Sequence, residues 1–370
     1  MNRLRVLPVV GIAVVLLLSL ALGGSASARS LLVVPLVEHW DGTVWTQVAA
    51  PTGSAGLNAV VAPAATDVWG FGTSRTAVHW DGTSWHRVSL PLPKGSAFGE
   101  FVAAAALSPA DIWAVGDVST HALIDHWNGR RWTYVPGPPN NRYSLTGVAA
   151  LSATDVWAVG ETGVTTPTGG GERTVTIHWN GKAWKRVPSP NPTTRMTSSP
   201  NFNDTLAAVA GSSAHNVWAV GQYWVVKNGT RGPRSLVLHW NGSRWKQVPT
   251  PDPLTRGHAS YLSGMAAPSA TGVWAVGTVN RHGAGHALAE FWNGAHWRIV
   301  STTGPPLSGV SALGAADAWA AGGRDVGGDV MHWNGSAWSV KTKLGDRRGL
   351  LSVAEVSPTD VWVVGGLVKH

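Results

Sequence analysis

The sequence predicts an all-β fold, a closed seven-bladed β-propeller built from four-stranded antiparallel blades. Two repeated motifs carry this prediction, and each occurs seven times in the 370 residues. The first has the form HW(D/N)GxxW, with Phe in place of His once, and the second is DVWAVG with variants. Successive copies of the first motif start 40 to 61 residues apart, around the length of a four-stranded propeller blade.

Tryptophan marks both motifs in every unit. The first motif begins at His39, His79, His126, His178, His239, Phe291 and His332. The second is centred on Trp69, Trp113, Trp157, Trp218, Trp274, Trp319 and Trp362. Three tryptophans in each of seven units account for 21 of the 22 in the chain, so only Trp224 lies outside the repeat.

Each unit resolves into four strands, A to D, in chain order. In the unit around Trp157, strand A is expected at residues 145–151, and strand B contains the DVWAVG motif. Strand C ends at Trp179, where an Asn-Gly pair predicts a two-residue hairpin before strand D. In such a hairpin, Trp179 and Trp184 share one face and stack diagonally, which favours packing between blades over sugar binding.

The two ends of the chain are expected to complete one blade together. Residues 37–48 read as a C–D hairpin, and residues 350–366 read as an A–B pair. Counting the halves leaves no remainder, so the N-terminal C–D strands pair with the C-terminal A–B strands and the ring closes.

The order of these motifs resembles bacterial propellers of the kelch and Asp-box (BNR) kind, and it is similar to tectonin-type lectin repeats. The resemblance covers residues 31–370. The turn is one residue shorter than the usual Asp-box, and the paired glycines of kelch repeats are missing. The resemblance therefore implies the fold and no particular activity.

Acidic residues of the second motif are expected to pair with the histidines of the first. Gly272 replaces the acid in the unit where Phe291 replaces the histidine, so donor and acceptor disappear together. We therefore expect a buried hydrogen bond in the other units, as in WD-repeat blades. The pairs are Asp67–His79, Asp111–His126, Asp155–His178, Asn216–His239, Asp317–His332 and Asp360–His39. A catalytic role for these histidines is the weaker alternative, since a general base is one placed residue and not a periodic one.

The N-terminus has the layout of a secretory signal. A basic start and a mostly apolar run precede Ala26-Ser27-Ala28, a small-residue cleavage site. We expect residues 1–28 to be the signal peptide and residues 29–370 to form one propeller domain, extracellular or at the cell surface. An uncleaved membrane anchor is the alternative. Since the chain has no cysteine, the exported domain holds together without disulfides.

Partners are less clearly indicated than the fold. The formal charge of +8 is compatible with an anionic cell-wall polymer and indicates no specific nucleic acid. His282 and His286 could form a metal pair, but the sequence places no third ligand beside them, so we expect no metal and no cofactor.

Function is expected on one face of the ring. The A–B and C–D turns are short and uniform and share a face, whereas the B–C and D–A loops on the other face vary widely. The longest loops belong to blades three to five, and variable loops on a rigid scaffold are where binding usually occurs. They comprise residues 160–175, 188–205, 221–235, 249–261 and 279–287.

Trp224 is the leading candidate binding residue. With Tyr223 and nearby cations it could form an exposed platform for a sugar or a protein; alternatively, Trp224 covers its own extended hairpin. The candidate set is Tyr223, Trp224, Lys227, Arg231, Arg234, His258, Tyr261, Arg281 and His282.

These features predict an exported binding scaffold whose ligand is a glycan, an anionic cell-wall polymer or a surface protein. The alternative is a secreted carbohydrate-active hydrolase or lyase with a loop-built site. A sialidase-like site needs an arginine cluster, a tyrosine and acids, and no blade contains a recognisable triad of this kind. A copper site with a Cys–Tyr crosslink is excluded because the chain lacks cysteine.

Overall fold

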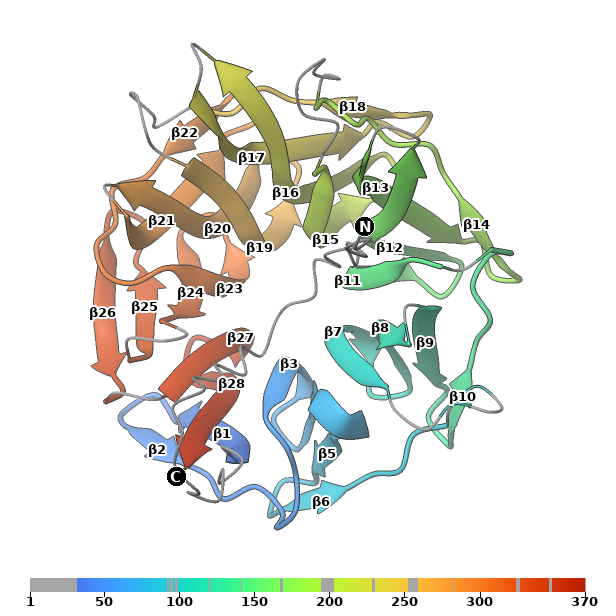
Figure 1. Cartoon of the computed structure of the whole chain (residues 1–370). Coiled ribbons are helices and arrows are strands. Elements are labelled where there is room, and N and C mark those ends of the chain that lie inside the picture. The colour runs from blue at the N-terminus through green and yellow to red at the C-terminus, as the bar shows by residue number, and fades with distance from the viewer. Residues whose placement is uncertain are drawn as a thin grey trace, which may run out of the picture.

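Seven sheets surround a central axis in the computed structural model of the chain (Figure 1). It describes residues 32–369 except 92, 94–95, 97–98, 120, 141, 167–168, 194–202, 228–229, 252–258, 282, 324–326 and 346–347. Each sheet has four antiparallel strands, which confirms the predicted all-β, seven-bladed fold. The predicted signal peptide, residues 1–28, lies outside the described residues. No helix in the described part is long and apolar enough to cross a bilayer.

The strands of each blade run from A, beside the axis, to D at the rim. Blade 1 has β3 (Leu57–Ala64), β4 (Asp67–Gly72), β5 (Ala77–Trp80) and β6 (Trp85–Arg87). Blade 2 has β7 (Glu100–Ser108), β8 (Asp111–Val118), β9 (His121–Trp127) and β10 (Trp132–Tyr134). Blade 3 has β11 (Ser144–Ser152), β12 (Asp155–Thr166), β13 (Gly169–Trp179) and β14 (Trp184–Arg186). Blade 4 has β15 (Thr205–Ser213), β16 (Asn216–Lys227), β17 (Thr230–Trp240) and β18 (Trp245–Gln247).

Blade 5 has β19 (Ala259–Ser269), β20 (Gly272–Arg281), β21 (Ala284–Trp292) and β22 (Trp297–Ile299). Blade 6 has β23 (Leu307–Gly314), β24 (Asp317–Gly322), β25 (Asp329–Trp333) and β26 (Trp338–Lys343). Blade 7 joins both ends of the chain: β27 (Arg348–Ser357), β28 (Asp360–Lys369), β1 (Leu32–Trp40) and β2 (Trp45–Gln47). β1 pairs with β28 over nine residue pairs, so the ring closes as the sequence predicts.

Tryptophans fill every seam between blades. The strand-B tryptophan of one blade packs against the strand-C and strand-D tryptophans of the next. Trp157, for example, lies 4.8 Å from Trp240 and 5.3 Å from Trp245, measured between ring centroids. The seven strand-B indoles are at most 3% exposed. Because a ligand cannot reach them, they contribute packing and not sugar contacts.

The predicted two-residue hairpin between strands C and D is wrong. Trp179 lies directly opposite Trp184, with a four-residue loop between them. The side-chain oxygen of Asn180 accepts hydrogen bonds from the backbone N–H groups two and three residues further on, at 3.1 and 3.0 Å. Gly181 adopts a φ of 87°, and the loop closes around the Asn180 side chain. The two indoles therefore face each other across the strand pair, 5.9 Å apart, instead of diagonally.

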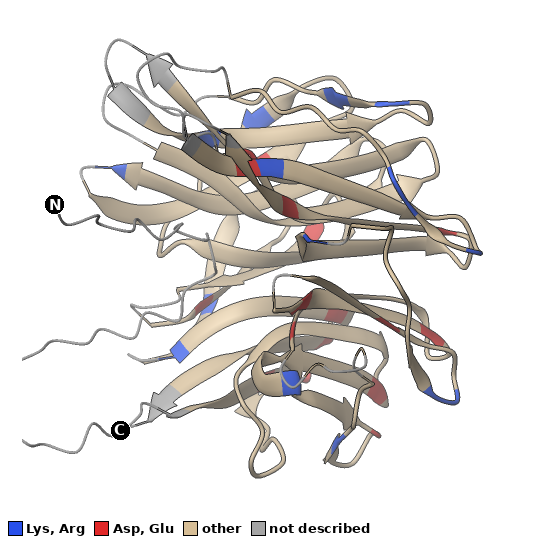
Figure 2. Cartoon of the chain, turned by 45° about the vertical axis from the view of Figure 1, so that its right-hand side comes forward, with Lys and Arg blue, Asp and Glu red and all other residues tan. Residues whose placement is uncertain are grey.

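Two faces of the ring differ as expected from the chain path. The C–D loop touches the A–B turn of its own blade: a Cβ on Gly181 would lie 2.6 Å from the Cγ2 atom of Thr154. We call this side the turn face, and the opposite side, with the B–C and D–A connections, the loop face. Basic and acidic residues are interspersed over the blades (Figure 2).

Candidate functional site: a groove on the loop face

A groove of about 360 Å³ lies on the loop face at the seam between blades 4 and 5. Tyr223, Arg234 and Ser235 come from the β16–β17 hairpin. Residues 247–251, at and after the end of β18, and Ser260 of β19 complete the lining. The groove is thus built from the variable connections of a rigid scaffold.

The strand lengths of blade 4 leave part of the outer edge of β17 without a strand partner. β17 pairs with β16 along its whole length, from Thr230 to Trp240. The edge strand β18 pairs only with residues 238–240, and the N–H of Val248 adds one more bond, to the carbonyl oxygen of Val237. Among the described residues, no D strand covers β17 beyond this point, and Arg234 and Ser235 of β17 line the groove.

Ser235 lies at the bottom of the groove and is 8% exposed. Its N–H donates to the hydroxyl oxygen of Ser260, which is 1% exposed, at 3.3 Å. The hydroxyl group of Ser235 is buried and makes no hydrogen bond. Such a group costs about 1–3 kcal/mol when it is left without a partner, so it marks a position where a bound molecule can gain free energy.

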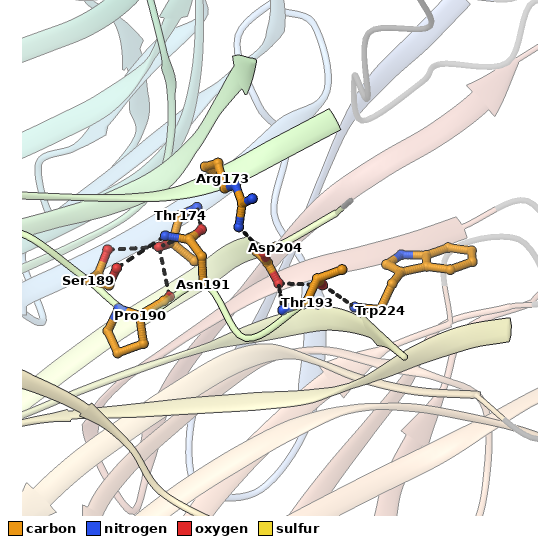
Figure 3. Close-up of polar contacts among 8 residues, drawn as sticks. All are labelled: Arg173, Thr174, Ser189, Pro190, Asn191, Thr193, Asp204 and Trp224. Atoms are coloured by element: carbon orange, nitrogen blue, oxygen red, sulfur yellow. Dashed lines mark hydrogen bonds and ion pairs between the residues drawn. The ribbon is translucent and has the colours of Figure 1, made fainter. Parts of the chain in front are cut away.

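Blade 3 shows the same position with its bonds completed (Figure 3). Thr174 is the counterpart of Ser235, since each lies five residues before the last tryptophan of strand C. The Thr174 hydroxyl lies 2.8 Å from Oγ of Ser189, 3.1 Å from the carbonyl oxygen of Pro190 and 3.3 Å from Oδ1 of Asn191. The N–H of Thr174 also donates to Oδ1 of Asn191, at 2.8 Å. The D–A loop of blade 3 therefore covers its own strand C.

A second contact anchors that loop. Oδ2 of Asp204, which is fully buried, lies 3.2 Å from Nη1 of Arg173. Oδ1 of Asp204 accepts bonds from the N–H and the hydroxyl of Thr193, at 3.0 and 2.6 Å. The pKa of Asp204 is raised by burial, and the hydrogen bonds from Thr193 and the charge of Arg173 offset only part of this rise. The Thr193 oxygen in turn accepts the backbone N–H of Trp224 at 3.0 Å, which links the loop to blade 4.

Two features of this arrangement are missing after blade 4: the length of the D–A connection and the aspartate that anchors it. From the strand-D tryptophan to the first strand-A leucine, the chain takes 22 residues after blade 3 (184 to 206) but only 17 after blade 4 (245 to 262). Counted back from that leucine, Ser260 stands where blade 3 has Asp204. Pro249, Thr250 and Pro251 line the groove and do not bond to the Ser235 hydroxyl.

The structure places two of the predicted binding residues in the groove and the others elsewhere or outside the described part. Tyr223 and Arg234 line the groove. Tyr261, half-buried, follows Ser260, and Arg281 is exposed at the end of β20 in blade 5. Lys227 and Arg231 lie in β16 and β17, with side chains outside the described part, and His258 and His282 are outside the described residues.

Trp224, a predicted platform residue, is half-buried. Its indole nitrogen is buried, and its backbone is held by Thr193. The D–A loop of blade 3 therefore holds the strand at this point.

Sequence reasoning missed Ser235, Gln247 and Ser260. Comparing Arg173-Thr174 with Arg234-Ser235 in the two blades is the signal that could have found the first of them.

The six predicted Asp/Asn–His pairs all lie within hydrogen-bond distance. Nε2 of each histidine is 2.7 to 2.9 Å from Oδ1 of its partner. They are not buried as expected: the paired Asp and His side chains are 17 to 29% exposed. Strand C ends at the turn face, where solvent reaches the imidazole edge. Phe291 packs on Trp274 at 4.7 Å, much as His39 stacks on Trp362 at 4.1 Å, so it keeps the ring contact without the bond.

Buried carboxyl groups occur away from the groove. Burial raises the pKa of Asp125 to about 8, although the positive charge of Arg75 lowers it in part. Burial, with the charge of Asp317 adding to it, raises the pKa of Glu355 to about 8. Glu355 is one of the residues around a shallow hollow of about 270 Å³ formed by strands A of blades 1, 2, 6 and 7. Among the described residues, no group of three or more His, Asp or Glu could hold a metal ion.

Comparison with known proteins supports the fold. No protein-family model and no curated protein matches the chain. YCF48 from Cyanidioschyzon merolae is 17% identical with a TM-score of 0.57, covering 89% of this chain and 99% of that one. YCF48 bound to D1 peptide is 14% identical with a TM-score of 0.54, covering 90% and 97%. The WD40 propeller domain of Doa1 is 11% identical with a TM-score of 0.55, also covering 90% and 97%.

At these identities the comparisons establish the fold alone. They are to YCF48 and WD40 propellers, so the resemblance to kelch, Asp-box and tectonin repeats is not confirmed. The chain is a seven-bladed β-propeller with the fold of these proteins.

Proposed function

We propose that the chain is an exported binding scaffold that takes a segment of a partner protein into the groove between blades 4 and 5. The observation that carries this proposal is the buried Ser235 hydroxyl, which makes no hydrogen bond and lies at the bottom of a groove on the variable face. Among the similar structures, one is described as bound to a peptide, which favours a protein segment over a glycan or a cell-wall polymer.

The hydrolase or lyase alternative gains no support from the carboxyl groups of Glu355 and Asp317. Among the described residues that line its hollow, Glu355 is the sole ionisable one, whereas most glycoside hydrolases use two carboxyl groups that flank the scissile bond. Among the described residues, the groove is lined by Tyr223 and Arg234 but by no histidine, aspartate or glutamate, the side chains that most often transfer protons.

Selection from a displayed library of random dodecapeptides tests the proposal. We expect the wild-type protein to enrich a set of peptides, and the Thr250→Trp variant, which fills the groove, to bind them at least tenfold more weakly. Ser243→Trp, in the exposed C–D loop of the turn face, is the matched control and should bind as the wild type does. Failure to enrich any peptide, or binding only to a glycan array probed in parallel, would refute a peptide-binding function.

Export is tested separately. We expect the full-length chain, expressed with its own N-terminus, to be released in a form that begins at Arg29. N-terminal sequencing of the secreted protein checks this, and a chain that keeps residues 1–28 in the membrane fraction contradicts cleavage.

A further inference from the structure

We propose that the groove recognises an asparagine or aspartate side chain of an extended partner segment, whose side-chain oxygen bonds to the Ser235 hydroxyl. This inference rests on the proposed function and specifies the ligand of the same site.

Blade 3 supplies the template. There Oδ1 of Asn191 accepts the N–H of Thr174 at 2.8 Å and lies 3.3 Å from the Thr174 hydroxyl, which also contacts Oγ of Ser189 and the carbonyl oxygen of Pro190. Blade 4 has the same strand C with Ser235 in place of Thr174, and no bond reaches its hydroxyl. A partner segment can supply to blade 4 what blade 3 obtains from its own chain.

The bonds at the bottom of the groove define what the ligand must offer. The N–H of Ser235 is already bonded to Ser260, so the backbone of β17 presents no donor at this residue. Recognition therefore depends on the Ser235 hydroxyl, which donates to an oxygen acceptor such as Oδ1 of asparagine or aspartate. An apolar side chain at this position would leave the hydroxyl without a partner and would lose that bond.

The walls suit a proline-containing, extended neighbour. Pro249, Pro251 and the half-buried aromatic Tyr223 are among the residues that line the groove. Aromatic surfaces bind extended proline-rich segments because these are already ordered before binding. In blade 3 the residue before Asn191 is Pro190, in agreement with this preference.

Binding of capped hexapeptides Pro-Ser-Pro-X-Pro-Thr, the sequence of residues 188–193 with X at position 191, tests the inference. Fluorescence anisotropy is measured for X = Asn, Asp, Leu and Lys. We expect the Asn or Asp peptide to bind at least tenfold more tightly than the Leu and Lys peptides. Ser235→Ala should remove this difference, and Ser235→Thr, which restores the blade-3 residue, should retain it.

Thr174→Val is the matched control: its hydroxyl is already bonded within blade 3, so peptide affinity should not change. Circular dichroism and thermal unfolding of each variant establish that it is folded before binding is measured. Equal binding of all four peptides, no binding of any, or an Asn preference that persists in Ser235→Ala overturns the inference. The peptide-library selection can still succeed in these cases, so failure here is distinguishable from failure of the proposed function.

Discussion

Single side chains in the seams set how stability depends on pH. Asp125 is fully buried in strand C of blade 2, facing blade 1, and neither of its oxygens has a hydrogen-bond partner. Four of the other blades have an apolar residue at this position (Val78, Ile177, Leu238 and Met331), and two have a glutamate (Glu290 and Glu38). Since burial raises the pKa of Asp125 from 3.8 to about 8, the carboxyl is protonated in the folded protein at neutral pH.

We predict that Asp125→Val, which introduces the blade-1 residue, makes stability less dependent on pH. The folded protein binds a proton that the unfolded chain has released, so the free energy of unfolding falls as the pH rises from about 4 to about 8. Urea unfolding at pH 5, 7 and 9 measures this loss. The variant should lose less stability over this range than the wild type, and an unchanged pH dependence contradicts the assignment.

The C–D loop shows how an element is determined by one side chain. Asn180 closes its loop by accepting two backbone N–H groups, and Asp41 does the same in blade 7, at 2.8 and 2.9 Å. The bonds that Asp41 receives from Thr43 and Val44 lower its pKa to about 2. Asparagine and aspartate are therefore interchangeable in this loop, provided that the oxygen is present.

We predict that Asn180→Asp changes the free energy of unfolding at pH 7 by less than about 0.5 kcal/mol, whereas Asn180→Ala costs about 1 kcal/mol or more. The difference arises because alanine removes the acceptor of both loop N–H groups. Thermal unfolding of the two variants side by side measures it, and equal stability of the two would rule out this role for the Asn180 oxygen.

At the scale of the whole molecule, stability depends on joining the two ends of the chain. β1 contributes nine residue pairs to β28, and Trp40 and Trp45 pack on Trp319 of blade 6. Without β1 and β2, the edge of β28 and the indole of Trp319 would be exposed, and such an edge favours pairing between molecules.

We predict that a chain beginning at residue 48 unfolds at a much lower temperature and self-associates, compared with a chain beginning at residue 32. The shorter chain lacks both strands that complete blade 7. Light scattering after gel filtration and thermal unfolding compare the two. A monomeric shorter chain with an unchanged unfolding temperature would show that the joint is dispensable.

Prediction from the sequence worked best where the signal was periodic. The strands, the blade number, the ring closure and the Asp/Asn–His contacts all follow from motifs repeated seven times, because each repeat reports the same local geometry. It failed where one side chain redirects the backbone, as Asn180 does in the C–D loop. Trp224 breaks the repeat, but its backbone N–H bonds to Thr193 in a loop from another blade, a contact that no local pattern reveals.

The groove illustrates what only tertiary structure decided. Arg173-Thr174 and Arg234-Ser235 are nearly identical in sequence, as are the Pro-Ser-Pro and Pro-Thr-Pro segments that follow them. Whether such a segment covers the strand edge depends on loop length and on contacts between distant residues, such as Ser235 with Ser260. The sequence by itself determined the scaffold because hydrophobic periodicity acts within each blade. The structure decided which hydroxyl remained without a partner, because that depends on how chain segments from neighbouring blades meet.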